Sequence, residues 1–554
     1  MLLAVFSNYL ILLIILGYSY LLKKITYTKD EIIIENTDIL YGLAFIIFIS
    51  LFSNFFLPLA SLKIIIILIG FIIFLYGLTK KIFKLNFLLY FLIIFFTTFV
   101  AFYNSMNIDS PMYHLQIIKW LTYNKISFGL SNLEIRLGFN SSWHSLIALL
   151  DIKINQFSLK YYLSSLIFGS LIYETIKTKI KINYSDIFLY LTISYLLFYS
   201  FVHPYHNGVI LNHLGNPERD IIGMLFFFLI IFYFLKVLEN KKNVNYINLL
   251  TLSIFLCLTS RLTMAPMVLL LFFILYKNNN FKILNFTYIL LFLTTILWVL
   301  RSFFLSGCLF FPFAKSCFKT SWAVNVKEVE FFVMEAMRIS RTLPSRNGVN
   351  DLNFSLNTYN WIPQWINDYF LSAAILQIGS TIIVVTIISF ILISLFKKTF
   401  IKDTFKISDF FVLFSLILII FLWFINAPET RYALGPIISL PCFIIIMFLK
   451  KINFIRFIEF NNFRLSLIMG ALCFMLAFKS FHYFQFKDLF INSKIQHNYS
   501  HIVKIGKFSD EEFYWGKFLC ADFKNICVNT VKENYIIGNI LNYKVYKSDT
   551  WLKN

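Results

Sequence analysis

The chain has 554 residues, of which 59% are hydrophobic and only 14% are charged. A soluble globular domain carries a larger charged share, so the composition excludes that class and predicts a polytopic membrane protein. The formal net charge of +21 would suggest nucleic acid in a soluble protein, but here the Lys residues stand in short clusters at the ends of apolar runs. Such clusters signal membrane topology, and we expect no nucleic acid partner.

Apolar runs long enough to cross a bilayer recur along the chain, without the alternation of polar and apolar residues that a barrel strand needs. We therefore predict an all-α polytopic protein with about 14 transmembrane helices, in a range of about 12 to 14. The predicted spans are 2–22, 38–57, 61–79, 85–103, 160–176, 186–202, 220–237, 246–260, 262–276, 285–304, 371–396, 408–425, 433–449 and 465–480.

Basic clusters such as Lys23-Lys24 and Lys80-Lys81 occupy every second connection between these spans. The positive-inside rule makes those connections cytoplasmic, so the N-terminus, the other connections and the C-terminal tail are expected outside. This arrangement predicts a multi-pass protein of the bacterial cytoplasmic membrane. The predicted membrane domain covers residues 1–480 with outer loops 104–159, 203–220 and 305–370, and an extracytoplasmic tail follows at 481–554.

The first outer loop opens with a helix-start pattern around Asp109. Ser110 is a candidate cap, Pro111 suits the first helical position, and the helix should run through Tyr123. Its apolar and polar residues separate onto two sides, which predicts a helix lying along the membrane surface. Asp109 would then sit at a helix N-terminus that favours anions or a metal-bound phosphate, although a plain capping role is the alternative.

The same loop continues with a polar and aromatic stretch before the next span. Carboxylates, amides and a Trp ring in this mixture are typical of sugar binding, but an ordinary interfacial anchor has the same composition. The residues concerned are Asn132, Glu134, Arg136, Asn140, Ser142, Trp143 and His144.

The second outer loop brings Glu218 and Asp220 to the start of a span, just after His203, His206 and His213. Paired carboxylates at a membrane surface suit metal-assisted phosphate chemistry, so a divalent metal held by Asp109, Glu218 and Asp220 is one hypothesis. The alternative is a cluster of acids and bases that pair with one another.

Three arginines stand at predicted outer span ends, namely Arg261, Arg301 and Arg431. A guanidinium there is suited to holding phosphate oxygens, while snorkelling to the interface is the alternative explanation for each one. Two cysteine pairs, Cys308 with Cys317 and Cys520 with Cys527, also fall in segments expected outside, where disulfides can form or the spacing can be chance.

Five motifs in order, D-S-P-M-Y-H-L, G-L-S-N-L-E-I-R-L-G-F-N-S-S-W, S-G-C-L-F-F-P, S-W-A-V and W-F-I-N-A-P-E-T-R-Y, resemble those of a bacterial multi-pass membrane family that is GT-C-like. They extend over about residues 100 to 435. GT-C glycosyltransferases use polyprenyl-phosphate sugar donors, have an acid in the first outer loop and carry surface helices there. The present chain departs from them because its first-loop acid follows the fourth predicted span, has no adjacent acid, and is followed by Glu134 where close relatives carry a His.

The resemblance implies a membrane glycosyltransferase in which Asp109 is the catalytic base and Arg431 binds phosphate. The implied partners are the lipid bilayer, a polyprenyl-phosphate sugar donor and a glycan, lipid or protein acceptor. An O-antigen polymerase or ligase, a transporter or flippase of glycolipids, and a non-catalytic assembly factor are the alternatives. The predicted substrate-binding residues are Tyr113, His114, Glu134, Arg136, Asn140, Trp143, His144, Glu218, Asp220, Arg261 and Arg431.

Overall fold

The computed structural model describes most of the chain. The described residues are 1–27, 32–103, 107, 109–154, 157–177, 182–202, 212–240, 243–278, 285–342, 359–366, 406–451, 462–481, 502–508, 511–516, 520–521, 523, 525–528, 535–540 and 543–548. Of the predicted features, His203, His206 and the span at 371–396 lie outside them.

Helices make up most of the described chain, as the sequence predicts. The α-helices are α1 (Leu2–Thr26), α2 (Ile39–Asn54), α3 (Leu59–Thr79), α4 (Phe87–Phe102), α5 (Leu115–Tyr123), α6 (Ser142–Leu150), α7 (Leu163–Ile176), α8 (Tyr184–Val202), α10 (Asp220–Glu239), α11 (Val244–Ser260), α12 (Val268–Asn278), α13 (Phe286–Ser306), α14 (Val326–Thr342), α16 (Trp361–Trp365), α18 (Ile407–Asn426), α19 (Leu434–Lys451) and α20 (Asn462–Phe481).

Six of the described helices are long and apolar enough to cross a membrane, judged by length and composition. They are α1, α2 with the short turn before it, α3, α10, α13 and α18. Shorter apolar helices include α4, α7, α11 and α19. These helices fit a protein embedded in a membrane, whereas the count of about 14 spans stays a prediction.

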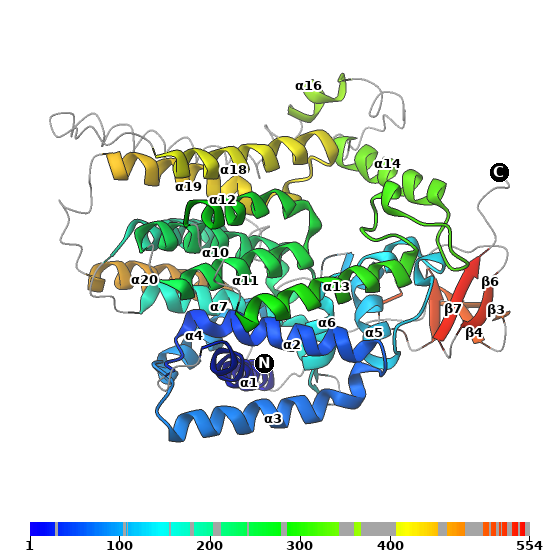
Figure 1. Ribbon diagram of the computed structural model, residues 1–554, viewed down its shortest axis with the longest axis horizontal. Helices are drawn as coiled ribbons and strands as arrows, with labels where there is room; N and C mark the ends of the chain where they lie inside the picture. Colours follow the sequence, from blue (N-terminus) through cyan, green and yellow to red (C-terminus); the bar gives the residue numbers. More distant parts are fainter. Residues whose placement is uncertain are drawn as a thin grey trace.

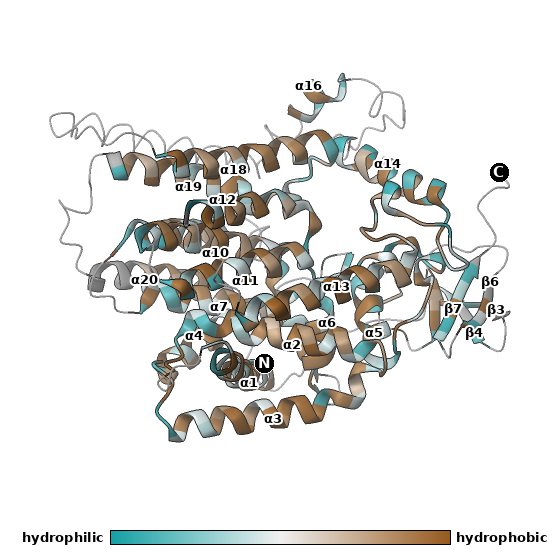
Figure 2. Cartoon of the chain, in the orientation of Figure 1, coloured by the Kyte–Doolittle hydropathy of each residue, from teal (hydrophilic) through white to brown (hydrophobic). Residues whose placement is uncertain are grey.

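The long helices are stacked with their axes roughly alongside one another (Figure 1). Helix α10 packs against α8, α11 and α19 and is almost entirely covered by protein. Helix α3 lies at the edge of the stack, and its Ile64 and Ile72 side chains are 69% and 62% exposed. Figure 2 shows hydrophobic residues dominating both helices, so the exposed side of α3 is suited to lipid rather than water.

The C-terminal segment forms strands, so the prediction of an all-α chain is wrong for this segment. Strands β3 (Val503–Phe508) and β4 (Glu511–Trp515) are antiparallel, and β5 (Ile526–Val528) pairs with β4 in parallel. Strands β6 (Tyr535–Ile540) and β7 (Tyr543–Ser548) form an antiparallel pair. Two further short strands pair within the first long loop, β1 (Lys153–Ile154) and β2 (Phe157–Ser158).

The C-terminal strands lie beside α5, at the end of the helix stack where α14 also lies (Figure 1). Buried residues of this segment, such as Val528 and Tyr546, belong to the main hydrophobic core. The structure joins Cys520 to Cys527 and Cys308 to Cys317 as disulfides, which answers a question that the cysteine spacing left open. We refer to residues 502–548 as the C-terminal unit.

Candidate functional site

The site is built on the helical segment that follows Asp109. A wide π-helical turn, η2 (Ser110–His114), leads directly into α5, so the predicted helix from Ser110 through Tyr123 is confirmed. Asp109 stands at the start of this segment and Pro111 lies in its first turn, where a missing amide hydrogen costs nothing. The predicted capping role of Ser110 was wrong, because its hydroxyl donates to the Asn216 and Glu218 side chains instead.

The polar side of α5 is covered by the C-terminal unit and does not face water along a membrane surface. Gln116 Nε2 donates to the carbonyls of Cys520 and Ala521 at 3.2 and 2.6 Å, and Lys119 Nζ donates to the Asn525 carbonyl at 2.6 Å. The Ala521 amide donates to the Pro111 carbonyl at 2.6 Å. Both faces of α5 are therefore buried by protein, and its position along a membrane surface stays a prediction.

Asp109 forms an ion pair with Arg431, a residue 322 positions away in the chain. Arg431 lies on the short helix η13 (Thr430–Tyr432), and its Nε also pairs with Glu429 Oε1 at 2.5 Å. The Asp109 and Arg431 side chains are 18% and 20% exposed. The predicted partners are therefore in direct contact at a partly open surface.

A second ion pair adjoins the first. Arg261 Nη1 lies 2.7 Å from Asp220 Oδ1, and the same nitrogen donates to the Arg431 carbonyl at 3.3 Å. Both guanidinium groups make cation–π contacts with the Tyr432 ring. The ring centroid lies 4.9 Å from Arg261 Cζ and 5.1 Å from Arg431 Cζ. Two arginines and three carboxylates thus form one network, which we call the acid–arginine cluster (Asp109, Asp220, Arg261, Glu429, Arg431 and Tyr432).

The cluster is assembled from the ends of apolar helices. Asp109 follows α4, Asp220 begins α10, Arg261 follows α11, and Arg431 lies between α18 and α19. Their direct contacts require these four helix ends to lie on one side of the protein, which fits the topology predicted from the basic clusters. Which side of a membrane that is remains a prediction.

Burial and the neighbouring charges shift the pKa values of this cluster, and for Glu429 and Arg431 the two effects oppose each other. Burial raises the pKa of Glu429 even though Arg431 opposes the shift, so removal of Arg431 would favour the protonated acid. Burial also raises the pKa of Tyr432, and the neighbouring Glu429 adds to the effect. For Arg431, burial lowers the pKa, but Tyr432 and the three carboxylates of the cluster outweigh it, and the pKa is raised. The guanidinium is therefore held charged.

Glu218 links the segment before α10 to the segment that contains Asp109. Its Oε2 accepts from Asn107 Nδ2 at 3.4 Å and lies 2.6 Å from His213 Nδ1, while its Oε1 accepts from Ser110 Oγ at 3.2 Å. Burial would lower the pKa of His213, but the hydrogen bond and charge of Glu218 outweigh it and raise that pKa. Through these hydrogen bonds, Glu218 fixes the position of the start of the helix that follows Asp109.

Two predicted histidines, His114 and His144, form a buried pair. His114 Nδ1 and His144 Nε2 are 3.0 Å apart, so one ring donates and the other accepts. Burial, followed by the charge of Arg219, lowers the pKa of His144 to about 3, and burial with His144 lowers the pKa of His114 well below its usual value. Tyr113 packs on His114 with ring centroids 4.1 Å apart.

Other predicted binding residues are placed elsewhere. Arg136 pairs with Glu134 at 3.8 Å, and its Nη1 contacts Met112 Sδ at 2.9 Å. Asn140 binds Arg301 Nη1 through its side-chain oxygen at 2.6 Å and is fixed to Trp298 by two hydrogen bonds. Trp143 is 1% exposed and packs edge-on against Phe226, so its face is covered by protein.

The metal hypothesis finds no cluster to support it among the described residues. No group of three or more His, Cys, Asp or Glu side chains there is arranged to hold a metal ion. Asp109, Asp220 and Glu218 each have a different partner, namely Arg431, Arg261 and His213. We therefore derive no step through a metal.

Sequence reasoning overlooked two members of the site. Glu429 and Tyr432 flank Arg431 in the motif A-P-E-T-R-Y, and a carboxylate two residues before an arginine was the available signal. Asn216 was also missed, although its side-chain oxygen accepts from the Asn107 amide at 3.0 Å and from Ser110 Oγ at 3.2 Å.

Comparison with known proteins places the chain in a family. A family model described as a domain of unknown function, DUF8201, matches residues 1–438. The chain belongs to this family. No curated protein and no solved structure matches the chain. The matched range contains every member of the acid–arginine cluster, while the C-terminal unit lies beyond it.

Proposed function

We propose that this protein is a membrane glycosyltransferase of GT-C type, which moves a sugar from a polyprenyl-phosphate donor to an acceptor hydroxyl on the outer face of the bacterial cytoplasmic membrane. The observation that carries the proposal is the ion pair between Asp109 and Arg431 at the ends of apolar helices. The proposal takes Asp109 as the general base and Arg431 as the phosphate ligand, and it expects a lipid headgroup to meet them at these helix ends.

The proposed reaction is a single displacement at the anomeric carbon. The acceptor oxygen forms the new bond to that carbon, while the bond from the carbon to the phosphate oxygen breaks and its electron pair leaves with the polyprenyl phosphate. The acceptor proton passes to the Asp109 carboxylate. Attack from the face opposite the leaving phosphate inverts the anomeric configuration.

The arginines account for the other half of the chemistry. A guanidinium binds phosphate oxygens through two parallel hydrogen bonds, and the charge on the leaving phosphate grows as the sugar bond breaks. Arg431 and Arg261 are already adjacent and held by Tyr432. A donor phosphate would take over the Arg431 contact now made by Asp109, which would release the carboxylate to act as the base.

The two disulfides favour an extracytoplasmic position for the site. Cystine bridges persist in oxidising compartments and are rare in the bacterial cytosol. The bridge from Cys520 to Cys527 lies in the unit that binds α5, and the bridge from Cys308 to Cys317 follows α13. Both belong to segments that the basic clusters also predict to be outside.

The test is complementation of a strain that lacks this gene and has a measurable surface-glycan defect. We expect Asp109→Asn and Arg431→Ala to fail while wild type and Arg338→Ala restore the glycan, with all variants present in the membrane at equal levels. Arg338 is the matched control because its ion pair with Glu335 on α14 lies outside the cluster. Normal glycan from both cluster variants would overturn the proposal, and loss of glycan transport without loss of transfer would favour a flippase.

A further inference from the structure

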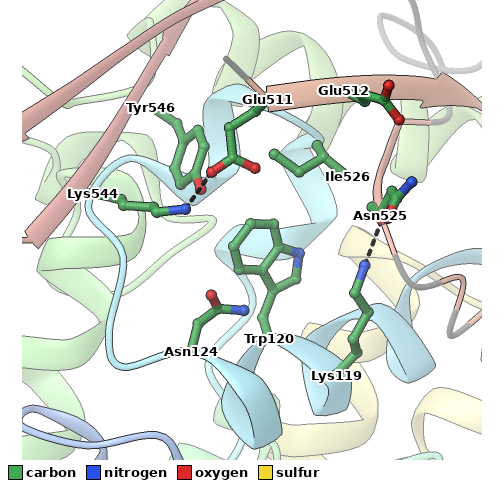
Figure 3. Close-up of a pocket in the computed structure, with 9 residues that line it drawn as sticks. All are labelled: Lys119, Trp120, Asn124, Glu511, Glu512, Asn525, Ile526, Lys544 and Tyr546. Atoms are coloured by element: carbon green, nitrogen blue, oxygen red, sulfur yellow. Dashed lines mark hydrogen bonds and ion pairs between the residues drawn. The ribbon is translucent and has the colours of Figure 1, made fainter. Parts of the chain in front are cut away.

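A pocket of about 240 Å³ lies between the end of α5 and the C-terminal unit. Figure 3 shows Lys119, Trp120 and Asn124 on one side and strand residues on the other, with the Trp120 ring in the middle of the group. It is lined only by described residues, and none of them was predicted to bind anything. Its charge, its polar groups and its position point to one class of ligand.

The formal charges of the pocket cancel. Lys119 and Lys544 are balanced by Glu511 and Glu512, and Lys544 forms an ion pair with Glu511. Glu512 is paired with Lys504 at 2.6 Å. A phosphate site would have an excess of cations and an ammonium site an excess of acids, so neither ion is favoured. An uncharged polar ligand fits the balance.

The remaining groups suit a ligand with hydroxyls and an apolar face. The Tyr546 side chain is 1% exposed and its hydroxyl has no hydrogen-bond partner among the described residues. Figure 3 shows that hydroxyl inside the group, beside the Lys544–Glu511 pair. A buried unpaired hydroxyl costs free energy until a ligand group or water satisfies it. The Asn124 and Asn525 side chains and the Trp120 ring supply the amides and aromatic surface that sugar rings use.

The walls of the pocket are fixed in place. The Phe128 amide donates to the Lys544 carbonyl at 2.8 Å, and the Tyr546 amide donates to the Phe128 carbonyl at 2.9 Å, so β7 is tied to the first outer loop. Gly129 has φ of 68°, and a Cβ there would lie 2.4 Å from the Tyr546 carbonyl oxygen. Only glycine allows this approach without strain. Preorganised walls lower the entropic cost of binding.

The pocket and Asp109 lie at opposite ends of one helical segment. Trp120 is eleven residues beyond Asp109, which corresponds to roughly 16 Å of helix. That separation is about the length of a short oligosaccharide whose end reaches the reacting hydroxyl. We infer that this pocket binds a neutral oligosaccharide as the acceptor subsite of the transferase, an inference that rests on the proposed function.

The probe is chitotetraose, a neutral tetrasaccharide, titrated into the full chain in lipid nanodiscs and followed by saturation-transfer NMR. We expect saturable binding, and Tyr546→Phe should weaken it about three- to tenfold because one hydrogen bond is lost. Tyr543→Phe is the matched control, since that ring lies on the same strand, stacks on Phe128 and does not line the pocket. It should bind as wild type does.

Three results would overturn the inference. These are no saturable binding by wild type, equal weakening by Tyr546→Phe and Tyr543→Phe, and tighter binding of tetragalacturonate, an anionic tetrasaccharide, than of chitotetraose. Asp109→Asn separates this test from the proposed function, because it should keep chitotetraose binding while losing transfer. Retained transfer by Asp109→Asn would refute the function even if the pocket binds sugar.

Discussion

The charged residues near the two ends of the helical segment from Asp109 to Tyr123 differ in solvent exposure and in the number of their charged neighbours. At the start, Asp109 and Arg431 keep only about a fifth of their side-chain surface exposed and belong to a network of six residues. At the far end, the Lys544 and Glu511 side chains are 46% and 32% exposed and pair with each other. Interactions between charges strengthen as water is excluded. The first end is thus suited to chemistry and the second to reversible binding.

Removal of Arg431 should give the largest effect. Arg431→Ala leaves Asp109 and Glu429 without their cation at a partly buried position, which should cost roughly 2–3 kcal/mol, below the range for fully buried pairs. The transition temperature of the detergent-solubilised protein measures this. Arg338→Ala, which breaks a single pair between residues one helical turn apart, should cost less than about 1 kcal/mol. Equal shifts for the two variants would refute the distinction between the charge network around Arg431 and a single ion pair.

The disulfide of the C-terminal unit should matter next. Replacing Cys520 and Cys527 by Ser opens a short loop and should cost about 2–3 kcal/mol. Because Gln116 donates to the Cys520 and Ala521 carbonyls, the amides of α5 should also exchange faster with deuterium.

The second disulfide is the matched control. Replacing Cys308 and Cys317 opens a loop of similar length after α13 and should leave α5 exchange unchanged. The docking of the C-terminal unit would not depend on its disulfide if both double variants changed α5 exchange alike.

The histidine pair should make stability depend on pH. His144 has a pKa of about 3 in the folded state, below its unfolded value near 6.5, so the unfolded chain binds the proton first. Its contribution is complete above about pH 6.5 and is lost as pH falls toward 3, which amounts to about 2 kcal/mol by pH 5. Transition temperatures from pH 7 to 5 should fall less steeply in His114→Gln/His144→Gln. If the transition temperature of the double variant depended on pH as steeply as that of wild type, groups other than these histidines would cause the pH dependence.

The exposed pair at the far end should give the smallest effect. Lys544→Met breaks the contact with Glu511 and should change stability by less than about 1 kcal/mol, because both groups are well hydrated. The effect should shrink further in high salt. If Lys544→Met lowered stability as much as Arg431→Ala does, the charged groups at the two ends of the helical segment would not differ in strength.

Local patterns predicted part of the fold and of the site. The helix after Asp109 follows from Pro111 and the residues that come next, and the apolar helices follow from their composition. The meeting of Asp109 with Arg431 followed from topology, since alternate connections share a side. These inferences need only local sequence patterns and the count of spans between two connections.

Long-range docking was beyond those patterns. Gln116 and Ala521 are 405 residues apart, and nothing in the periodicity of α5 indicates that strands will cover its polar side. The surroundings of Trp143 could not be predicted either. A Trp near a span end has the same sequence signature whether it contacts sugar, lipid or, as here, Phe226. The fate of such side chains depends on the elements that pack over them.

Transfer by Asp109→Asn tests the central claim most directly. The measurement is the initial rate of sugar transfer from a polyprenyl-phosphate donor in proteoliposomes, compared with Asp409→Asn, an equal change in an ion pair with Lys450 outside the cluster. We predict that Asp109→Asn lowers the rate by about 10²- to 10⁴-fold, as loss of a general base does, while Asp409→Asn stays near wild type. A rate for Asp109→Asn within about twofold of wild type would contradict the assignment of Asp109 as the base.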